Sequence, residues 1–131
     1  MPKILIADDS RVYVQLISGW VKDRGFEVVV ASDAIQAFVM ATRHLPAAVI
    51  LDISMPGGSG IDVLKKLKLS TNTKHIPVLV VTGNAGREMR SLVKRLGAAD
   101  LLEKPLDCDQ FCTILSGLTV EAHSSPTATT R

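Results

Sequence analysis

The chain has few cysteines, few aromatic residues and little net charge, and each shortage excludes a class of protein. Its two cysteines, Cys108 and Cys112, lie four residues apart in one expected helix. This spacing excludes a disulfide framework and is typical of free thiols in a reducing compartment. No second Cys or His pair accompanies them to complete a zinc site. A formal net charge of +2, with no aromatic residues interleaved among the basic ones, gives no indication of a nucleic-acid partner.

Long hydrophobic runs are also missing. The longest, such as AAVIL and VLVV, are far shorter than the roughly 20 residues that cross a bilayer. The N-terminal MPKILIADDS has too short an apolar region for a signal peptide. We therefore expect a cytoplasmic protein that does not insert into membranes. The 131 residues, 47% of them hydrophobic and 21% charged, fit one globular domain that folds without a disulfide or metal.

Five short apolar runs recur at fairly even intervals and are predicted to be strands. Most are apolar throughout instead of alternating, as in strands of a parallel sheet that are buried on both faces. The predicted strands are Ile4–Ala7, Glu27–Ala31, Ala47–Leu51, Pro77–Val81 and Ala99–Leu102.

Five segments with helical periodicity alternate with these strands, which predicts a doubly wound α/β sandwich. Apolar residues three or four apart predict one sheet-facing side on each helix. These residues are Val12, Leu16 and Trp20, flanked by Tyr13, Ile17 and Val21; Ile35, Phe38 and Val39; Ile61, Leu64 and Leu67; Met89, Leu92, Val93 and Leu96; and Phe111, Ile114, Leu115 and Leu118. Ser10 and Ser32 or Asp33 are expected to cap helix starts, and Gly25 and Gly97 to follow helix ends. We expect one domain over residues 1–120 and a flexible polar tail over 121–131.

Polar side chains interrupt the apolar pattern where the predicted strands end. Asp8 and Asp9 follow the first strand, Asp52 the third, Thr82 the fourth and Lys104 the fifth. Ligands of doubly wound sheets bind beyond the carboxyl ends of the strands, so these side chains should meet. Neighbouring carboxylates need a compensating cation, and an oxygen-rich site with open positions suits Mg²⁺. Added lysine and threonine groups for phosphoryl oxygens predict a phosphoryl-transfer site with a carboxylate nucleophile.

Each of these residues also has an ordinary structural explanation. An aspartate at a strand end often forms a turn, and Asp9 or Ser10 could simply cap the first helix. A lysine before a proline is usually a solvated loop residue. The placement of five such residues at one edge of the sheet favours the functional interpretation.

The stretches ILIADDS, VILDISMPGGSG, VLVVTGNAG and DLLEKPLD resemble, in this order, the receiver domains of bacterial response regulators over residues 3–118. The resemblance implies the flavodoxin-like receiver fold, a five-stranded parallel sheet of order 2-1-3-4-5 flanked by five helices. It also implies a two-component signalling function, in which a sensor histidine kinase or histidine phosphotransfer protein donates a phosphoryl group. The phosphorylated form would switch binding to a downstream protein or to an output domain outside this chain. The chain would be a phosphoacceptor and not a turnover enzyme, either stand-alone or excised from a larger regulator.

The resemblance further implies roles for single residues. Asp52 would be the phosphoacceptor, Thr82 would hydrogen-bond the phosphoryl group and Lys104 would pair with it. The Mg²⁺ ligands would be Asp9 directly, Asp8 largely through water, Asp52, and the backbone carbonyl of Ser54. The Lys104–Pro105 bond is expected to be cis.

Leu101 departs from the family pattern, because many receivers have Tyr or Phe three residues before the lysine. An aromatic rotation cannot occur here, so we expect the signal to pass through loop movement or through the fourth helix. The basic residues of that helix, Arg87, Arg90, Lys94 and Arg95, form a solvated face in the simplest interpretation. The alternative is a docking surface for an acidic partner.

Two other functions stay open from the sequence. A haloacid-dehalogenase phosphatase also uses Asp, Thr, Lys and Mg²⁺, but it needs a second Asp two residues after its nucleophile, where Ser54 stands. A receiver-like interaction module that is never phosphorylated generally lacks a key residue, and none is lacking here.

Overall fold

The computed structural model describes residues 1–55 and 59–119. The predicted tail over 121–131 lies outside this part of the chain. Ten elements alternate along it: β1 (Lys3–Ala7), α1 (Arg11–Lys22), β2 (Glu27–Ala31), α2 (Ala34–His44), β3 (Ala48–Asp52), α3 (Gly60–Leu69), β4 (Val78–Thr82), α4 (Arg87–Arg95), β5 (Asp100–Glu103) and α5 (Cys108–Leu118). The predicted order of strands and helices is confirmed, and each predicted strand agrees with an observed one to within a residue at either end.

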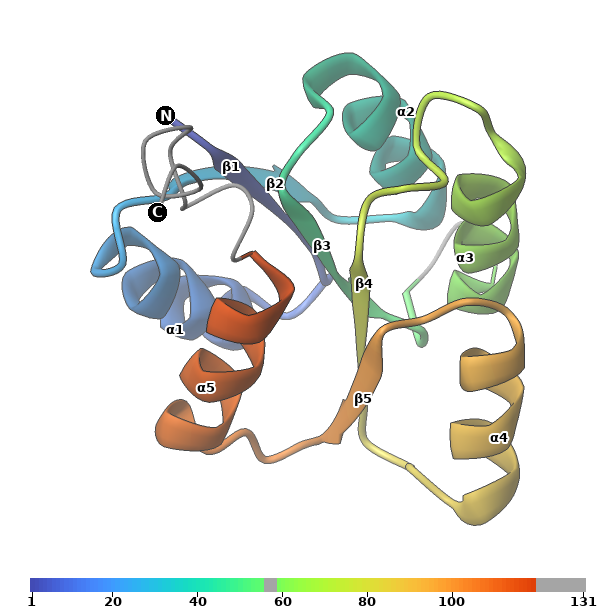
Figure 1. Cartoon of the computed structure of the whole chain (residues 1–131). Helices are drawn as coiled ribbons and strands as arrows, with labels where there is room; N and C mark the ends of the chain where they lie inside the picture. The colour runs from blue at the N-terminus through green and yellow to red at the C-terminus, as the bar shows by residue number, and fades with distance from the viewer. Residues whose placement is uncertain (56–58, 120–131) are drawn as a thin grey trace, which may run out of the picture.

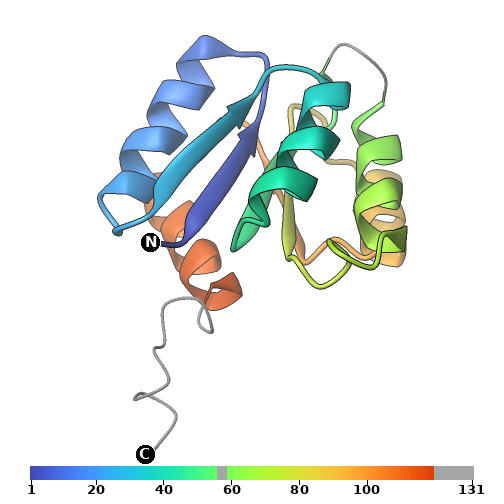
Figure 2. The same ribbon diagram turned by 90° about the horizontal axis from the view of Figure 1, so that it is seen from above.

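The five strands form one parallel sheet in the order β2-β1-β3-β4-β5, as the resemblance implied. Helices cover both faces of this sheet: α1 and α5 lie on one side, and α2, α3 and α4 on the other (Figures 1 and 2). All ten residues of the central strands β3 and β4 are buried. This burial explains why both read as continuous apolar runs in the sequence.

The sheet separates two hydrophobic cores. Leu5 and Ala7 of β1 face the core under α2, α3 and α4, whereas Ile4 and Ile6 face the core under α1 and α5. The alternation follows from strand geometry, since successive side chains point to opposite faces. Because every pair of neighbouring strands is parallel, the carboxyl ends of all five lie at one edge of the sheet.

The predicted apolar face of α1 was partly wrong. Val12 and Leu16 are 72% and 40% exposed, whereas Ile17 and Val21 are fully buried. Two neighbouring stripes on this helix are apolar, and periodicity alone does not decide which one faces the sheet. The sheet-facing stripe also carries Tyr13, which packs against the α1–α5 core.

The predicted face of α2 was also partly wrong. Ile35 is 67% and Val39 40% exposed, and only Phe38 of the predicted stripe packs against the core. The fully or nearly fully buried residues of this helix are alanines: Ala34, Ala37 and Ala41. Their small side chains let the helix approach the sheet closely, so larger residues lie to the sides.

The predicted helix boundaries are confirmed. The Ser10 hydroxyl accepts a hydrogen bond from the Tyr13 backbone N–H, and Asp33 caps α2 through the N–H of Gln36. Gly25 follows α1 with a φ of +89°, a backbone conformation that glycine adopts without steric cost. No helix of the described residues is both long and apolar enough to cross a membrane.

Candidate functional site

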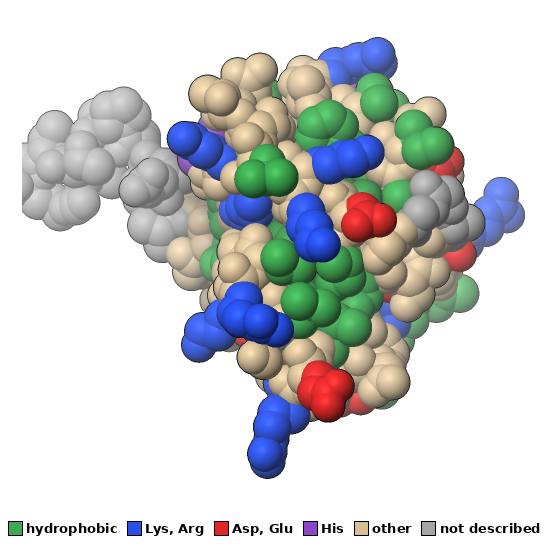
Figure 3. Space-filling model, turned by 90° about the vertical axis from the view of Figure 1, so that its right-hand side faces the viewer, with side chains coloured by type: hydrophobic (Ala, Val, Ile, Leu, Met, Phe, Trp, Pro, Cys, Tyr) green, Lys and Arg blue, Asp and Glu red, His purple; other side chains and the backbone are tan. Residues whose placement is uncertain are grey.

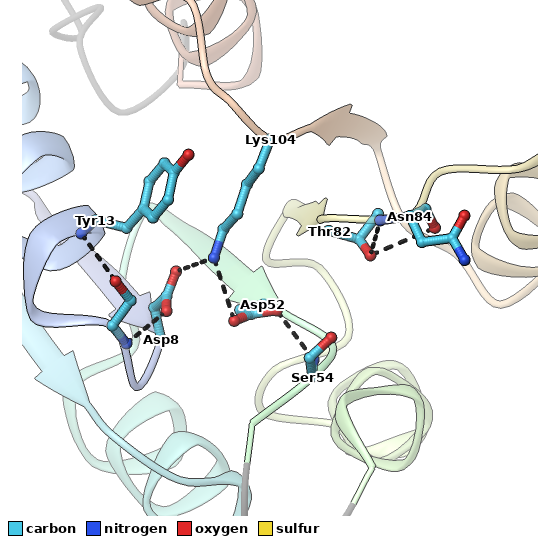
Figure 4. Close-up of polar contacts among 8 residues, drawn as sticks. Asp8, Tyr13, Asp52, Ser54, Thr82, Asn84 and Lys104 are labelled. Atoms are coloured by element: carbon cyan, nitrogen blue, oxygen red, sulfur yellow. Dashed lines mark hydrogen bonds and ion pairs between the residues drawn. The ribbon is translucent and has the colours of Figure 1, made fainter.

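The five residues predicted from strand ends lie at the same edge of the sheet. Figure 4 shows four of them, Asp8, Asp52, Thr82 and Lys104. Asp52 is the last residue of β3 and Thr82 the last of β4, while Asp8 follows β1 and Lys104 follows β5. Asp8, Asp52 and Thr82 are nearly inaccessible to solvent, with exposed fractions of 3%, 5% and 3%. Asp9 is exposed. The edge therefore carries buried polar groups with one carboxylate open to solvent.

Three carboxylates form an acidic cluster at this edge. One oxygen each of Asp8, Asp9 and Asp52 lies within 4.8 Å of the other two. Backbone groups orient two of these carboxylates: the N–H of Ser10 donates to Asp8 Oδ1 at 2.9 Å, and the N–H of Ser54 donates to Asp52 Oδ1 at 2.9 Å. The second oxygen of each buried carboxylate stays available to other groups at the site.

Lys104 bridges the two buried carboxylates. Its Nζ lies 3.1 Å from Asp8 Oδ2 and 3.4 Å from Asp52 Oδ2. The backbone N–H of Lys104 donates to the Thr82 carbonyl oxygen at 2.8 Å, which continues the pairing of β4 and β5. The Lys104–Pro105 bond is cis, as expected. The lysine is thus fixed at its backbone as well as at its ammonium group.

Burial and charge shift the ionisation of this pair. Burial raises the pKa of Asp52, and the Asp8 carboxylate raises it further, against the lowering effects of the Ser54 N–H and Lys104. Burial lowers the pKa of Lys104, but its hydrogen bond to Asp8 and the charges of Asp52 and Asp8 more than offset this, so its pKa is raised. The lysine is therefore protonated at neutral pH. One ammonium faces three carboxylate groups, and this imbalance favours a further cation.

Thr82 lies at the predicted edge but makes only local hydrogen bonds among the described residues. Its Oγ1 accepts from the Asn84 backbone N–H at 3.1 Å and lies 3.5 Å from the Asn84 carbonyl oxygen. These bonds fix the first turn of the β4–α4 loop. A bond from this hydroxyl to a phosphoryl group stays a prediction.

Two residues with structural roles at the site were not identified from the sequence. The Tyr13 ring lies under Lys104, with 4.2 Å from Nζ to the ring centroid. Tyr13 was interpreted only as part of a helix face, and no local pattern relates it to a lysine 91 positions later. Gly60, the first residue of α3, appeared in the sequence analysis only as the last residue of the stretch VILDISMPGGSG. A side-chain carbon there would lie 3.0 Å from the Asp52 carbonyl oxygen and still closer to the Ile53 Cα.

The face beyond Leu101 is basic. Leu101 is 5% exposed in β5. A hollow of about 390 Å³ beside it is lined by apolar residues, by the basic Arg90 and Lys94 and by one acidic residue, Asp100. Arg87 and Arg95 of α4 are exposed as well. Figure 3 shows Lys and Arg side chains spread around a hydrophobic patch on the side that carries α3 and α4. The side chains are solvated as the simpler interpretation required; a docking role stays a prediction.

Comparison with known proteins gives the family. The model of the response regulator receiver domain matches residues 4–116. The chain is 40% identical over 105 residues to the response regulator PleD of Caulobacter vibrioides, covering 80% of this chain and 23% of PleD. It is 33% identical over 107 residues to PilH of Pseudomonas aeruginosa, covering 82% of this chain and 88% of PilH. The chain thus spans less than a quarter of PleD.

Solved structures of receiver domains are similar in fold to this chain. The receiver domain of the sensor histidine kinase PA1611 of Pseudomonas aeruginosa PAO1, with a magnesium ion coordinated in its active site cleft, superposes with a TM-score of 0.83. The two are 25% identical over 91% of this chain and 98% of that one. Strand order, acidic edge and family match together define a receiver domain of two-component signalling. The chain belongs to the response regulator receiver family.

Proposed function

We propose that Asp52 accepts a phosphoryl group from a histidine kinase or histidine phosphotransfer protein in a Mg²⁺-dependent reaction. The observation that carries this proposal is the group of charged side chains that surrounds Asp52. Its carboxylate lies within 4.8 Å of carboxylate oxygens of Asp8 and Asp9, and 3.4 Å from the Lys104 ammonium. This arrangement supplies a nucleophile, ligands for a divalent cation and a positive charge for a phosphoryl oxygen.

The donor set suits Mg²⁺, because it consists of oxygen atoms from three carboxylates and leaves positions for water and substrate. Asp8, Asp9, Asp52 and the backbone carbonyl of Ser54 would hold the ion. Bound there, Mg²⁺ would offset negative charge on the phosphoryl oxygens. The magnesium ion in the similar PA1611 receiver domain supports this assignment.

The side chains of this chain have separable tasks in the transfer. A carboxylate oxygen of Asp52 forms a bond to phosphorus while the phosphorus–nitrogen bond of the donor phosphohistidine breaks. The Ser54 N–H holds Asp52 Oδ1 and so fixes the plane of the nucleophile. Lys104 pairs with a phosphoryl oxygen once Asp52 is phosphorylated, and the Thr82 hydroxyl donates to another after leaving its local bonds with Asn84. This movement of the β4–α4 loop changes the surface offered to a partner.

The partners follow from the receiver assignment. We propose that the receiver unit spans residues 1–120, with 121–131 as a tail, and that the phosphorylated form changes its binding to a downstream protein or output domain. A cytoplasmic location stays a prediction from the sequence.

Incubation with acetyl phosphate and Mg²⁺, followed by intact mass measurement, tests the acceptor. The wild-type chain should gain one phosphoryl group, EDTA should prevent the gain, and Asp52→Ala should show none. Asp62→Ala, which removes an exposed carboxylate of α3, is the matched control and should react like wild type. An adduct on Asp52→Ala would refute the acceptor assignment.

Two other outcomes would support the alternatives. Absence of an adduct on the folded wild-type chain would favour an interaction module that is not phosphorylated. Sustained hydrolysis of p-nitrophenyl phosphate over many turnovers would favour a phosphatase.

A further inference from the structure

Tyr13 makes a contact with the site that the proposed chemistry does not use. It is the only tyrosine of the chain and lies in the first turns of α1. The Lys104 Nζ stands 4.2 Å from its ring centroid, and Figure 4 shows the ring beside the lysine side chain that reaches down to Asp8 and Asp52. The ammonium therefore lies between a ring face and two carboxylates.

The ring is fixed by the same backbone that orients Asp8. The Ser10 N–H donates to Asp8 Oδ1, and the Ser10 hydroxyl accepts from the Tyr13 N–H at 3.3 Å. Tyr13 also packs against the core between α1, α5 and the sheet. A movement of the ring away from Lys104 would thus disturb the capped start of α1.

The ring and the carboxylates act differently on the lysine. Asp8 and Asp52 attract the ammonium by charge, but this attraction changes when a divalent cation binds or when Asp52 is phosphorylated. The ring carries no charge and attracts a cation through its quadrupole, so its effect persists in each of these states. A lysine stem has several rotatable bonds and would otherwise gain freedom once its carboxylate partners are engaged elsewhere.

We propose that Tyr13 is a positioning residue that keeps the Lys104 ammonium over Asp52 before and after phosphorylation. Tyr13 acts through Lys104 and has no bond to the phosphoryl group. The inference rests on the proposed acceptor role of Asp52 and adds a residue that sets how fast the transfer occurs. The ring is the active part, and the phenol oxygen is dispensable.

A double-mutant cycle on stability tests the contact without any phosphorylation. The unfolding constants of wild type, Tyr13→Leu, Lys104→Met and the double variant are measured by urea denaturation. A cation–ring contact predicts that the two substitutions are coupled by roughly two- to thirtyfold in the unfolding constant. Tyr13→Phe should retain the coupling. Independent effects of the two substitutions would overturn the contact, whatever the function of the site.

The rate of phosphorylation by acetyl phosphate at saturating Mg²⁺ tests the role. Tyr13→Leu should slow the transfer about three- to tenfold, within the range of a cation–ring contact, whereas Tyr13→Phe should restore the wild-type rate. In the Lys104→Met background Tyr13→Leu should have no further effect. Val12→Ala, on the same turn but 72% exposed, is the control and should leave the rate unchanged.

The outcomes separate this inference from the proposed function. An unchanged rate in Tyr13→Leu, or a Tyr13→Phe variant as slow as Tyr13→Leu, would overturn the positioning role while leaving Asp52 as acceptor. A wild-type chain that takes up no phosphoryl group would overturn the proposed function and the positioning role together.

Discussion

Replacement of Gly60 by alanine should destabilise the protein, although alanine is the better helix former. Gly60 begins α3 beside the end of β3, and its N–H donates to the Ile53 carbonyl oxygen at 3.3 Å. An alanine Cβ would lie 3.0 Å from the Asp52 carbonyl oxygen and 3.0 Å from the Ile53 carbonyl carbon. These neighbours are backbone atoms, so no change of rotamer relieves the overlap, and the start of α3 must move away from β3.

The magnitude follows from three contributions. Forcing an extra carbon into a packed contact typically costs about 1–3 kcal/mol. A weakened hydrogen bond to Ile53 adds about 0.5–1.5 kcal/mol. Alanine recovers at most about 1 kcal/mol of helix propensity. With the full helix propensity recovered, the expected net loss in the free energy of unfolding is therefore roughly 0.5–3.5 kcal/mol.

Urea denaturation followed by Trp20 fluorescence measures this loss, because Trp20 is the only tryptophan and packs against Phe111 with 5.3 Å between ring centroids. Gly19→Ala is the matched control. A Cβ at Gly19 in α1 has no neighbour within 4 Å, so this change should stabilise by about 0.5–1 kcal/mol. Equal stability of Gly60→Ala and wild type, or an equal loss in Gly19→Ala, would refute the close approach of α3 and β3 as the cause.

Two further predictions concern charged groups at a buried and a half-buried position. Burial raises the pKa of Asp52 above 3.8 in the folded, metal-free chain. The protein therefore loses stability as the pH rises from the pKa of Asp52 in the unfolded chain through its higher pKa in the folded chain. Asp52→Asn in EDTA should be more stable than wild type at neutral pH, and urea denaturation should show this gain vanish near about pH 3.5. A gain that is the same at both pH values would contradict the assigned cause. Lys68 Nζ donates to the carbonyl oxygens of Ile76 at 2.7 Å and Lys74 at 3.2 Å. Lys68→Met should therefore lower the free energy of unfolding by about 1–2 kcal/mol. Lys65→Met, at an exposed position of the same helix, is the control and should cause no measurable change. Equal midpoints for the two variants would rule out this bond pair as a stabilising contact.

The parts of the fold that were predictable from the sequence are those set by local pattern and topology. Continuous apolar runs predicted strands buried on both faces, and alternation with helices predicted the parallel sheet. The site followed from the same topology, because parallel strands with connecting helices have their carboxyl ends at one edge. Asp52 and Lys104 therefore could be placed together although 52 residues separate them.

The remaining features depend on tertiary contacts that a local pattern does not contain. Both apolar stripes of α1 have helical spacing, and only packing against the sheet shows that Ile17, not Val12, is buried. The contact between the Tyr13 ring and the Lys104 ammonium depends on how α1 and the end of β5 lie relative to each other in the folded chain. The need for glycine at position 60 likewise arises from a close approach in space. A Cβ there would meet the backbone of Asp52 and Ile53 at the end of β3.

The most direct test of Asp52 as acceptor is to locate the covalent bond. The chain is treated with acetyl phosphate and Mg²⁺, reduced with sodium borohydride, which converts an aspartyl phosphate to homoserine, and then mapped by tandem mass spectrometry. The proposed function predicts homoserine at position 52 and at no other aspartate. Conversion at Asp8 or Asp9, or no conversion at position 52 in a chain that has gained a phosphoryl group, would contradict it.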